Sequence, residues 1–355
     1  MSTVNSTLSE KQSVHGLIPS PALSIILIFN YLVIGLFVSA LGTLGNLVNI
    51  LVFTKEGYQD SVNITLSALA MSDIGALLLQ MAVIVLNSPI WNDVDIPFLS
   101  AATLCTQFFY PRQYFIRVSG VITAFAACEK CLCVVFPMRV RQIITRNFAI
   151  GANCFICIIL LLYFYPPYYS AYLDWGLDVK QNKTKIMVYY RSNAEKVLRI
   201  AYLVSDLSVP YITFCILILC NAVIVVKLKS KSKWRQSVAV RNSNLDTKRA
   251  ETSAREKKLA LMLATVSTLF VVCLLPQSIL LTCVSLVREL NLNGAYNDVT
   301  VLISSFTLLL ENINCSINIL VYYCMSTKYR KTFQACFLNA IKPNNEIVTR
   351  TKAVP

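Results

Sequence analysis

Seven long apolar stretches divide this chain of 355 residues and restrict it to one class of fold. A helix of about 20 residues crosses the ~30 Å hydrocarbon core of a bilayer, because each residue adds about 1.5 Å. The stretches lie near 23–53, 61–87, 102–133, 147–166, 198–227, 258–285 and 298–325. The sequence therefore predicts an all-α membrane protein, a seven-transmembrane helix bundle that occupies residues 23–326.

The composition agrees with this class and argues against others. Hydrophobic residues make up 56% of the chain and charged residues 14%, against about 25% charged residues in an average soluble domain. A soluble chain of this length needs more polar surface to cover its core. The same composition argues against disorder and against a basic nucleic-acid-binding domain, so we expect no nucleic-acid partner. Most of the 13 cysteines lie inside apolar stretches, where small buried hydrophobes are expected rather than disulfides.

The distribution of lysine and arginine predicts how the chain crosses the plasma membrane. Of the 32 cationic residues, 22 fall on one side of the predicted spans and eight on the other. By the positive-inside rule, residues 1–22 form an extracellular tail, and the basic loop 228–257 and the tail 339–355 are cytoplasmic. The basic loop then lies near anionic lipid or offers a docking surface to a cytosolic partner. Asn5 and Asn182 lie on the outer side in Asn-X-Thr motifs, so we expect both to be glycosylated.

Polar and charged side chains interrupt the apolar stretches, and such groups are functional candidates because they are costly in hydrocarbon. In chain order they include Asp73, Arg112, Arg117, Ser119, Glu311, Asn314, Asn318 and Tyr322. The last four step by three or four residues and therefore share one face of a helix. Hydrogen bonding between packed helices explains the amide and hydroxyl groups, but it explains the four charged groups poorly.

Six of the seven predicted spans each contain a short motif of their own. In chain order they are Gly45-Asn46, Leu69-Ala70-Met71-Ser72-Asp73, Glu129-Lys130-Cys131, Pro210, Cys273-Leu274-Leu275-Pro276 and Asn318-Ile319-Leu320-Val321-Tyr322. Over residues 30–338 they resemble the rhodopsin-like (class A) G-protein-coupled receptors. Within that family the stretch 117–133 is similar to molluscan chemosensory receptors. Residues 327–338 resemble the family's short amphipathic helix on the inner membrane face, with Cys336 as a candidate palmitoylation site.

The chain departs from the family pattern at several positions. Lys130 replaces the usual arginine and loses its planar fork of donors. Leu274 replaces the usual tryptophan of the sixth span, and Ile319 replaces the proline of the seventh. Cys105 stands where the family has a cysteine that pairs with the second extracellular loop, but residues 168–200 contain no cysteine. We therefore predict no disulfide there.

The resemblance implies a ligand-activated receptor without enzymatic activity that couples to a heterotrimeric G protein. A ligand in the outer half of the bundle would favour a state in which the sixth helix swings out and opens a cytoplasmic cleft. The coupling and switch positions are Glu129, Lys130, Glu256, Asn318 and Tyr322. In the resting state Lys130 is expected to pair with either Glu256 or its neighbour Glu129.

Two expectations concern cofactors. Asp73, Ser119 and Asn314, with Asn318, match the family's sodium pocket, since carboxylate, hydroxyl and amide oxygens suit a small hard cation. The alternative is a protonated Asp73 that bonds to neighbouring amides. Between Lys258 and Lys328 the seventh span offers no lysine for a Schiff base, so no retinal is expected.

The ligand site is predicted from charges in the third span. Arg112 and Arg117 lie five residues apart, a turn of about 140°, so they face different helices. By the family's arrangement Arg112 faces Glu311 and Arg117 faces Asp206, which predicts two buried ion pairs beside Gln113 on the floor of the outer cavity. Either the pairs only fix the helices, or a ligand carrying both charges opens them.

These features predict a chemosensory receptor for a zwitterionic or anionic small molecule, and the alternative is a neuropeptide receptor of the same fold. An arginine at position 112 disfavours a cationic amine ligand. Outside this class the alternative is a membrane transporter, although the sequence shows no internal repeat. The single histidine, His15, and the lack of a metal-ligand cluster argue against an enzyme.

Overall fold

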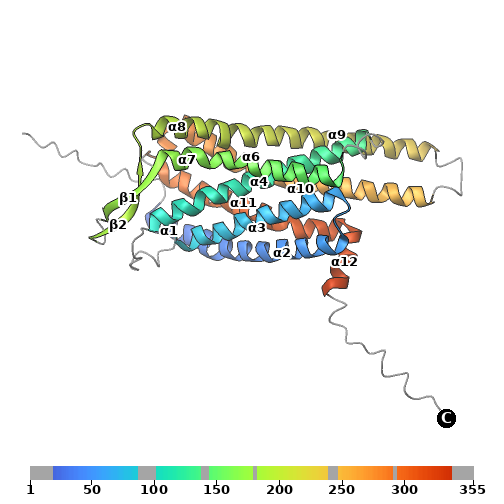
Figure 1. Cartoon of the computed structure of the whole chain (residues 1–355), viewed down its shortest axis with the longest axis horizontal. Coiled ribbons are helices and arrows are strands. Elements are labelled where there is room, and N and C mark those ends of the chain that lie inside the picture. The colour runs from blue at the N-terminus through green and yellow to red at the C-terminus, as the bar shows by residue number, and fades with distance from the viewer. Residues whose placement is uncertain are drawn as a thin grey trace, which may run out of the picture.

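The computed structural model describes residues 19–86, 101–136, 144–178, 182–238, 247–290 and 294–337. Within these ranges seven helical segments are long and apolar enough to cross a membrane, which confirms the predicted seven-helix bundle. The segments run alongside one another, with a β-hairpin at one end and α12 leaving the bundle at the other (Figure 1). We call these ends the hairpin end and the α12 end.

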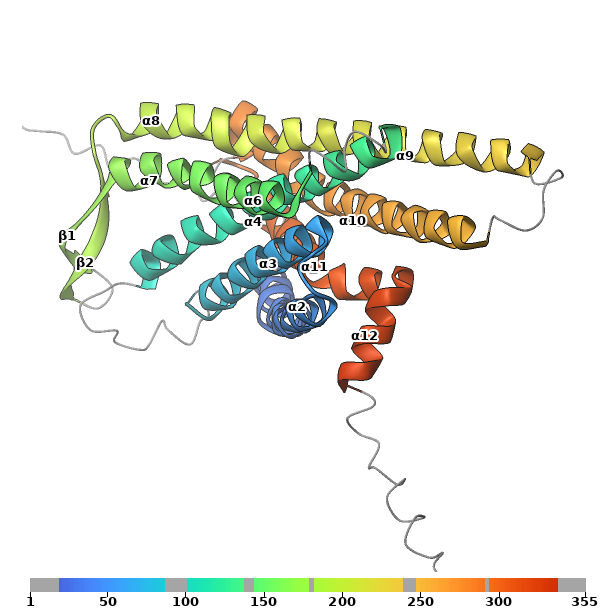
Figure 2. The same cartoon turned by 45° about the vertical axis from the view of Figure 1, so that its right-hand side comes forward.

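The spans have the following bounds. The first span consists of α1 (Ser20–Ile28), η1 (Phe29–Gly35) and α2 (Leu36–Glu56). The second is α3 (Ser61–Leu86), and the third is α4 (Ala101–Val135). The fourth consists of α6 (Arg146–Leu160), η3 (Leu161–Phe164) and α7 (Tyr165–Ser170), and the fifth of α8 (Ala194–Ala201), η4 (Tyr202–Ser208) and α9 (Val209–Val238). The last two are α10 (Thr247–Leu286) and α11 (Asn297–Met325), with the short η5 (Arg288–Leu290) between them. Then α12 (Thr327–Phe337) turns away from α11 (Figure 2).

The fifth and sixth spans extend beyond their expected ends at residues 227 and 258. Helix α9 continues to Val238 and α10 already begins at Thr247, so both helices enter the segment expected to be a loop. The segment 227–258 contains neither glycine nor proline and is rich in lysine and arginine. Lysine and arginine favour helix, which accounts for the extensions of α9 to Val238 and of α10 back to Thr247. Residues 239–246 lie outside the described part.

The antiparallel hairpin was not expected from the sequence. Strand β1 (Ala171–Asp178) pairs with β2 (Lys183–Tyr190) in a register that runs from Ala171 opposite Tyr190 to Asp178 opposite Lys183. Isoleucine, valine and tyrosine in β2 favour strand. Asn182 in the turn has φ 50°, in the left-handed region that asparagine tolerates, and its exposed position leaves the predicted glycosylation acceptor accessible.

The bundle buries polar groups and exposes apolar ones, as a membrane protein does. On α2, Phe37, Leu41 and Leu44 are 64, 52 and 60% exposed, whereas Asn46 is 1% exposed. The Asn46 amide donates to the carbonyl oxygen of Cys315 on α11 at 2.7 Å, which joins the first and seventh spans. The exposed apolar face is suited to lipid, and the buried polar groups find partners inside the bundle.

Candidate functional site

A cavity of about 380 Å³ lies in the half of the bundle nearer the hairpin end. Segments α4, η3, η4, α9, α10 and α11 all contribute lining side chains. Its aromatic lining consists of Phe109, Tyr110, Tyr163, Tyr202, Phe214 and Phe270, and its polar lining of Gln113, Arg117, Asp206, Thr213, Gln277, Ser278 and Glu311. The volume falls within the range of small-molecule sites, about 300–1,000 Å³.

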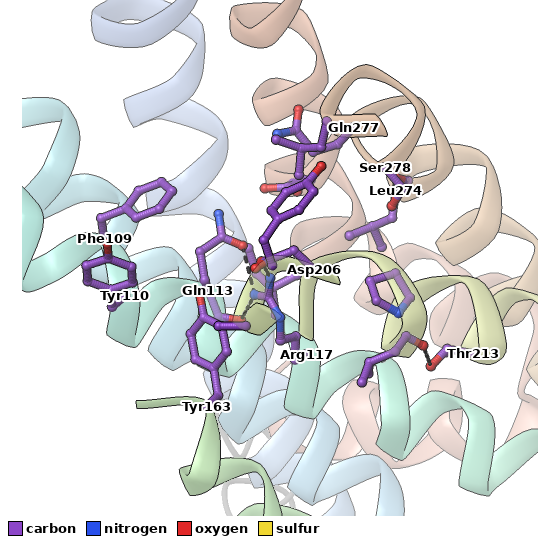
Figure 3. A pocket seen from close by; sticks show the side chains of 18 of the residues that line it. Phe109, Tyr110, Gln113, Arg117, Tyr163, Asp206, Thr213, Leu274, Gln277 and Ser278 are labelled. Atoms are coloured by element: carbon purple, nitrogen blue, oxygen red, sulfur yellow. Dashed lines mark hydrogen bonds and ion pairs between the residues drawn. The ribbon is translucent and has the colours of Figure 1, made fainter. Parts of the chain in front are cut away.

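Arg117 and Asp206 form the ion pair that the sequence predicted, but the pair lies at the centre of this cavity rather than on its floor (Figure 3). The Arg117 guanidinium also donates to the carbonyl oxygen of Ser205 at 3.1 Å and to that of Gln113 at 2.8 Å. It lies over the ring of Tyr163, 4.4 Å from the centroid. Every guanidinium nitrogen is therefore engaged, although Asp206 remains 21% exposed.

Local helix geometry explains why the Ser205 carbonyl has no backbone donor and is available to Arg117. Segment η4 is π-helical, a form in which the carbonyl of residue i accepts from the N–H of residue i+5, as Val204 does from Val209. The residue five positions after Ser205 is Pro210, which has no N–H. The Ser205 oxygen therefore has no donor in that register, and Arg117 supplies one. The sequence motif containing Pro210 gave no indication of this contact.

Arg112 and Glu311 form the second predicted ion pair. Arg112 Nη2 lies 2.7 Å from Glu311 Oε2, and the two side chains are 1 and 4% exposed. Within the described residues, Arg112 Nε and Nη1 have no hydrogen-bond partner. Glu311 lines the cavity whereas Arg112 is not among the lining residues, so the carboxylate separates the guanidinium from the open space.

Asp73 lies at the centre of the predicted sodium pocket and is 0% exposed. Ser119 Oγ donates to Asp73 Oδ1, and Asn318 Nδ2 donates to Asp73 Oδ2, both at 2.8 Å. Asn314 is buried but makes no hydrogen bond to this carboxylate. Among the described residues Asp73 has no lysine or arginine partner. The carboxylate and hydroxyl oxygens suit a sodium ion, whereas Asn318 presents its N–H groups.

Several predicted coupling residues lie at the α12 end. Glu129 accepts a hydrogen bond from Ser61 at 2.5 Å, and its carboxylate lies 3.8 Å from Lys130 Nζ. Of the two partners proposed for Lys130, the structure therefore shows Glu129. Glu256 lies in α10, but its side chain is outside the described part. Asn5, the other predicted glycosylation acceptor, is also outside it.

Tyr322 and α12 form a packed junction with α2 at the same end. The Tyr322 ring is 5.5 Å from Phe53 and 5.8 Å from Tyr329, centroid to centroid. The Tyr329 hydroxyl donates to Asn49 Oδ1 at 2.6 Å. Burial raises the pKa of Tyr329, so the hydroxyl stays protonated and able to donate. An ion pair of 2.9 Å joins Lys328 to Glu56. No sequence motif predicted either of these two contacts.

Cys336, the candidate palmitoylation site, is a half-buried free thiol in α12. A second cavity, of about 330 Å³, lies at the α12 end beside Tyr322 and Lys258. The structure thus separates the predicted site residues into an ion-paired cavity near the hairpin end, the Asp73 cluster, and a junction at the α12 end.

Comparison with known proteins gives two matches. The family model for the seven-transmembrane receptor (rhodopsin family) matches residues 45–322. The FMRFamide receptor of Drosophila melanogaster is 23% identical over 326 residues, which is 84% of this chain and 52% of that receptor. The chain thus spans about half the length of this curated relative. The likeness to molluscan chemosensory receptors is not shown by these matches.

Proposed function

The chain belongs to the seven-transmembrane receptor (rhodopsin) family, and from that premise we propose that it is a G-protein-coupled receptor for a peptide ligand. The observation that carries the proposal is the cavity with a partly exposed ion pair at its centre. Its aromatic and hydrogen-bonding lining suits the mixed groups of a peptide. A volume of about 380 Å³ accepts one end of a peptide rather than its whole length.

The relative's name adds support for a peptide over the small zwitterion first expected from the sequence. It is called an FMRFamide receptor, which is a receptor for a peptide amide. We place the hairpin end outside the cell and the α12 end in the cytoplasm, because 22 of the 32 cationic residues then lie on the cytoplasmic side. The cavity is then reached from outside, and a G protein meets Glu129 and Lys130 from inside.

The geometry suggests how ligand binding changes the bundle. A polar or charged ligand group competes with Asp206 for Arg117, or with Arg117 for Asp206. When Arg117 moves, the Ser205 carbonyl loses its donor, so the π-helical segment η4 loses a contact that holds it in place. A ligand that binds this altered arrangement more tightly shifts the population toward it. The fifth span continues through α9 to the opposite end of the bundle and transmits the shift.

The direct test adds the tetrapeptide amide Phe-Met-Arg-Phe-NH₂ to membranes that contain the chain and a heterotrimeric G protein. We expect peptide-dependent nucleotide exchange on the G protein, and we expect Asp206→Asn to weaken the response while surface expression is retained. A response to free amino acids but to no peptide in a panel of peptide amides would favour the small-molecule ligand. Peptide uptake without nucleotide exchange would favour a transporter.

A second test concerns coupling. Lys130→Arg is expected to preserve or raise G-protein activation, because arginine restores the fork of donors, whereas Lys130→Ala is expected to lower it about tenfold or more. Nucleotide exchange at saturating peptide, normalised to surface expression, measures both variants. If the two variants match the unsubstituted receptor, Lys130 does not carry coupling.

A further inference from the structure

The part of the cavity deepest in the bundle is apolar. It is lined by Phe214, Phe270 and Leu274, all at most 7% exposed. Thr213 also faces this region, but its hydroxyl donates to the carbonyl oxygen of Val209 at 2.8 Å. The deep region therefore has little hydrogen-bonding capacity to offer a polar ligand group, and it favours an apolar one.

This apolar floor lies beyond the ion pair rather than beside the entrance. Along α4, Phe109 and Gly120 both line the cavity and are 11 residues apart, which corresponds to about 16 Å of helix. Arg117 lies between them. In Figure 3, Leu274 and Thr213 lie on the side of Arg117 away from Phe109 and Tyr110. A ligand that reaches the floor must therefore pass the ion pair.

Gly120 and Leu274 determine how much space the floor offers. A Cβ atom at Gly120 would lie 2.7 Å from Cζ of Phe270, so the absence of a side chain lets the Phe270 ring pack directly against α4. On α10, Leu274 brings no aromatic ring into the cavity. Larger side chains at these two positions would occupy the space or push the Phe270 ring into it.

We propose that this floor is a subsite for an aromatic or branched apolar side chain at the end of the ligand. The ion pair then reads the polar backbone or charged group that follows. The inference rests on the proposed function in that it takes this cavity to be the ligand site. It adds the chemical class of the group that enters first and the residues that set its size.

The first test fills the subsite. Leu274→Phe adds a ring to the floor, and it is expected to weaken the potency of Phe-Met-Arg-Phe-NH₂ about 10- to 100-fold, the effect of losing one buried side chain. An analogue with alanine in place of the buried phenylalanine should lose a similar factor and then be insensitive to Leu274→Phe. Both single-alanine analogues are measured, one for each phenylalanine of the peptide. If Leu274→Phe weakens both analogues as much as the parent peptide, or weakens none of the three, the subsite is overturned.

The matched control is Gly151→Ala in α6. A Cβ at Gly151 has no atom within 4 Å, so this variant reports the effect of a substitution in a lipid-facing helix and should leave potency unchanged. Gly120→Ala is the second floor variant, because its Cβ pushes the Phe270 ring toward the cavity. It should weaken the parent peptide, but not the insensitive analogue, by about tenfold.

A second measurement needs no agonist and separates this inference from the proposed function. The probe is the neutral 4-fluorobenzyl alcohol, followed by ¹⁹F line broadening with the purified full-length protein in detergent micelles. We expect broadening with the unsubstituted protein and with Gly151→Ala, and its reduction to the level of empty micelles with Leu274→Phe. Equal broadening in all three proteins, or none, contradicts the subsite. Fragment binding without any peptide response leaves the subsite intact and contradicts the peptide receptor.

Discussion

Glu311→Gln is expected to lower the stability of the protein by about 3–5 kcal/mol, because it leaves the guanidinium of Arg112 as a buried charge without a charged partner. The pair is 2.7 Å apart, and its side chains are 1 and 4% exposed. Arg112 has no other partner to turn to, since its Nε and Nη1 are unbonded within the described part of the chain. A loss of this size is a large fraction of the stability of a protein. Surface expression in cells and the melting temperature of purified protein measure it.

Asp206→Asn provides the comparison. Asp206 is 21% exposed, and Arg117 keeps its bonds to the backbone carbonyls of Ser205 and Gln113 when the carboxylate is removed. We therefore expect a loss of about 1 kcal/mol, close to that of an ordinary hydrogen bond. If Glu311→Gln costs no more than Asp206→Asn, burial does not decide the energetics of these pairs.

A charge exchange then separates structure from ligand recognition. Arg112→Glu combined with Glu311→Arg keeps both charges but reverses their polarity. If the double variant restores expression and leaves ligand potency unchanged, the pair serves only to hold α4 against α11. Restored expression with potency lowered tenfold or more shows that the ligand interacts with the polarity of the pair.

Sequence patterns predicted the features that a membrane environment requires: long apolar spans, and partners for charges buried within them. Uninterrupted apolar length identified the seven spans, and the cost of an unpaired charge in hydrocarbon predicted partners for Arg112 and Arg117. The family's arrangement of helices then selected Glu311 and Asp206, and both pairs are confirmed. The spans depend on local composition, and the ion pairs depend on the high cost of an unpaired charge in hydrocarbon.

Features set by competing weak preferences were not predicted. The hairpin formed by β1 and β2 depends on pairing between two strands, and each strand mixes polar and apolar residues. The contact of η4 with Arg117 joins groups 88 residues apart, so local sequence patterns do not report it. The extensions of α9 and α10 depend on helix propensity, which hydropathy does not report.

The Asp73 cluster shows the limit of transferring a family motif. Asp73, Ser119 and Asn318 meet as the motif implies, but Asn314 does not bond to the carboxylate. Asn318 uses its amide N–H groups, so it must turn before its oxygen can face a cation. The structure thus brings Asp73, Ser119 and Asn318 together, and sodium binding there stays a prediction.

We expect sodium to lower agonist potency about fivefold or more relative to choline, and Asp73→Asn to abolish that difference. A carboxylate that is 0% exposed and whose hydrogen bonds come only from the neutral side chains of Ser119, Asn318 and Cys315 within the described residues requires a cation or a proton. A sodium ion on Asp73 and Ser119 would favour the resting arrangement of α3, α4 and α11. Peptide potency in matched sodium and choline salts measures the effect.

A sodium ion and a proton on Asp73 predict different results in this measurement. If sodium neutralises Asp73, the asparagine variant has high potency in both salts, because a neutral side chain no longer attracts the ion. If a proton neutralises Asp73, potency in the unsubstituted receptor does not distinguish sodium from choline at any concentration. Ser119→Ala refines the test, since it removes one oxygen ligand and leaves the carboxylate. It should weaken the sodium effect without abolishing it, whereas an unchanged effect in both variants would place the sodium ion elsewhere in the protein.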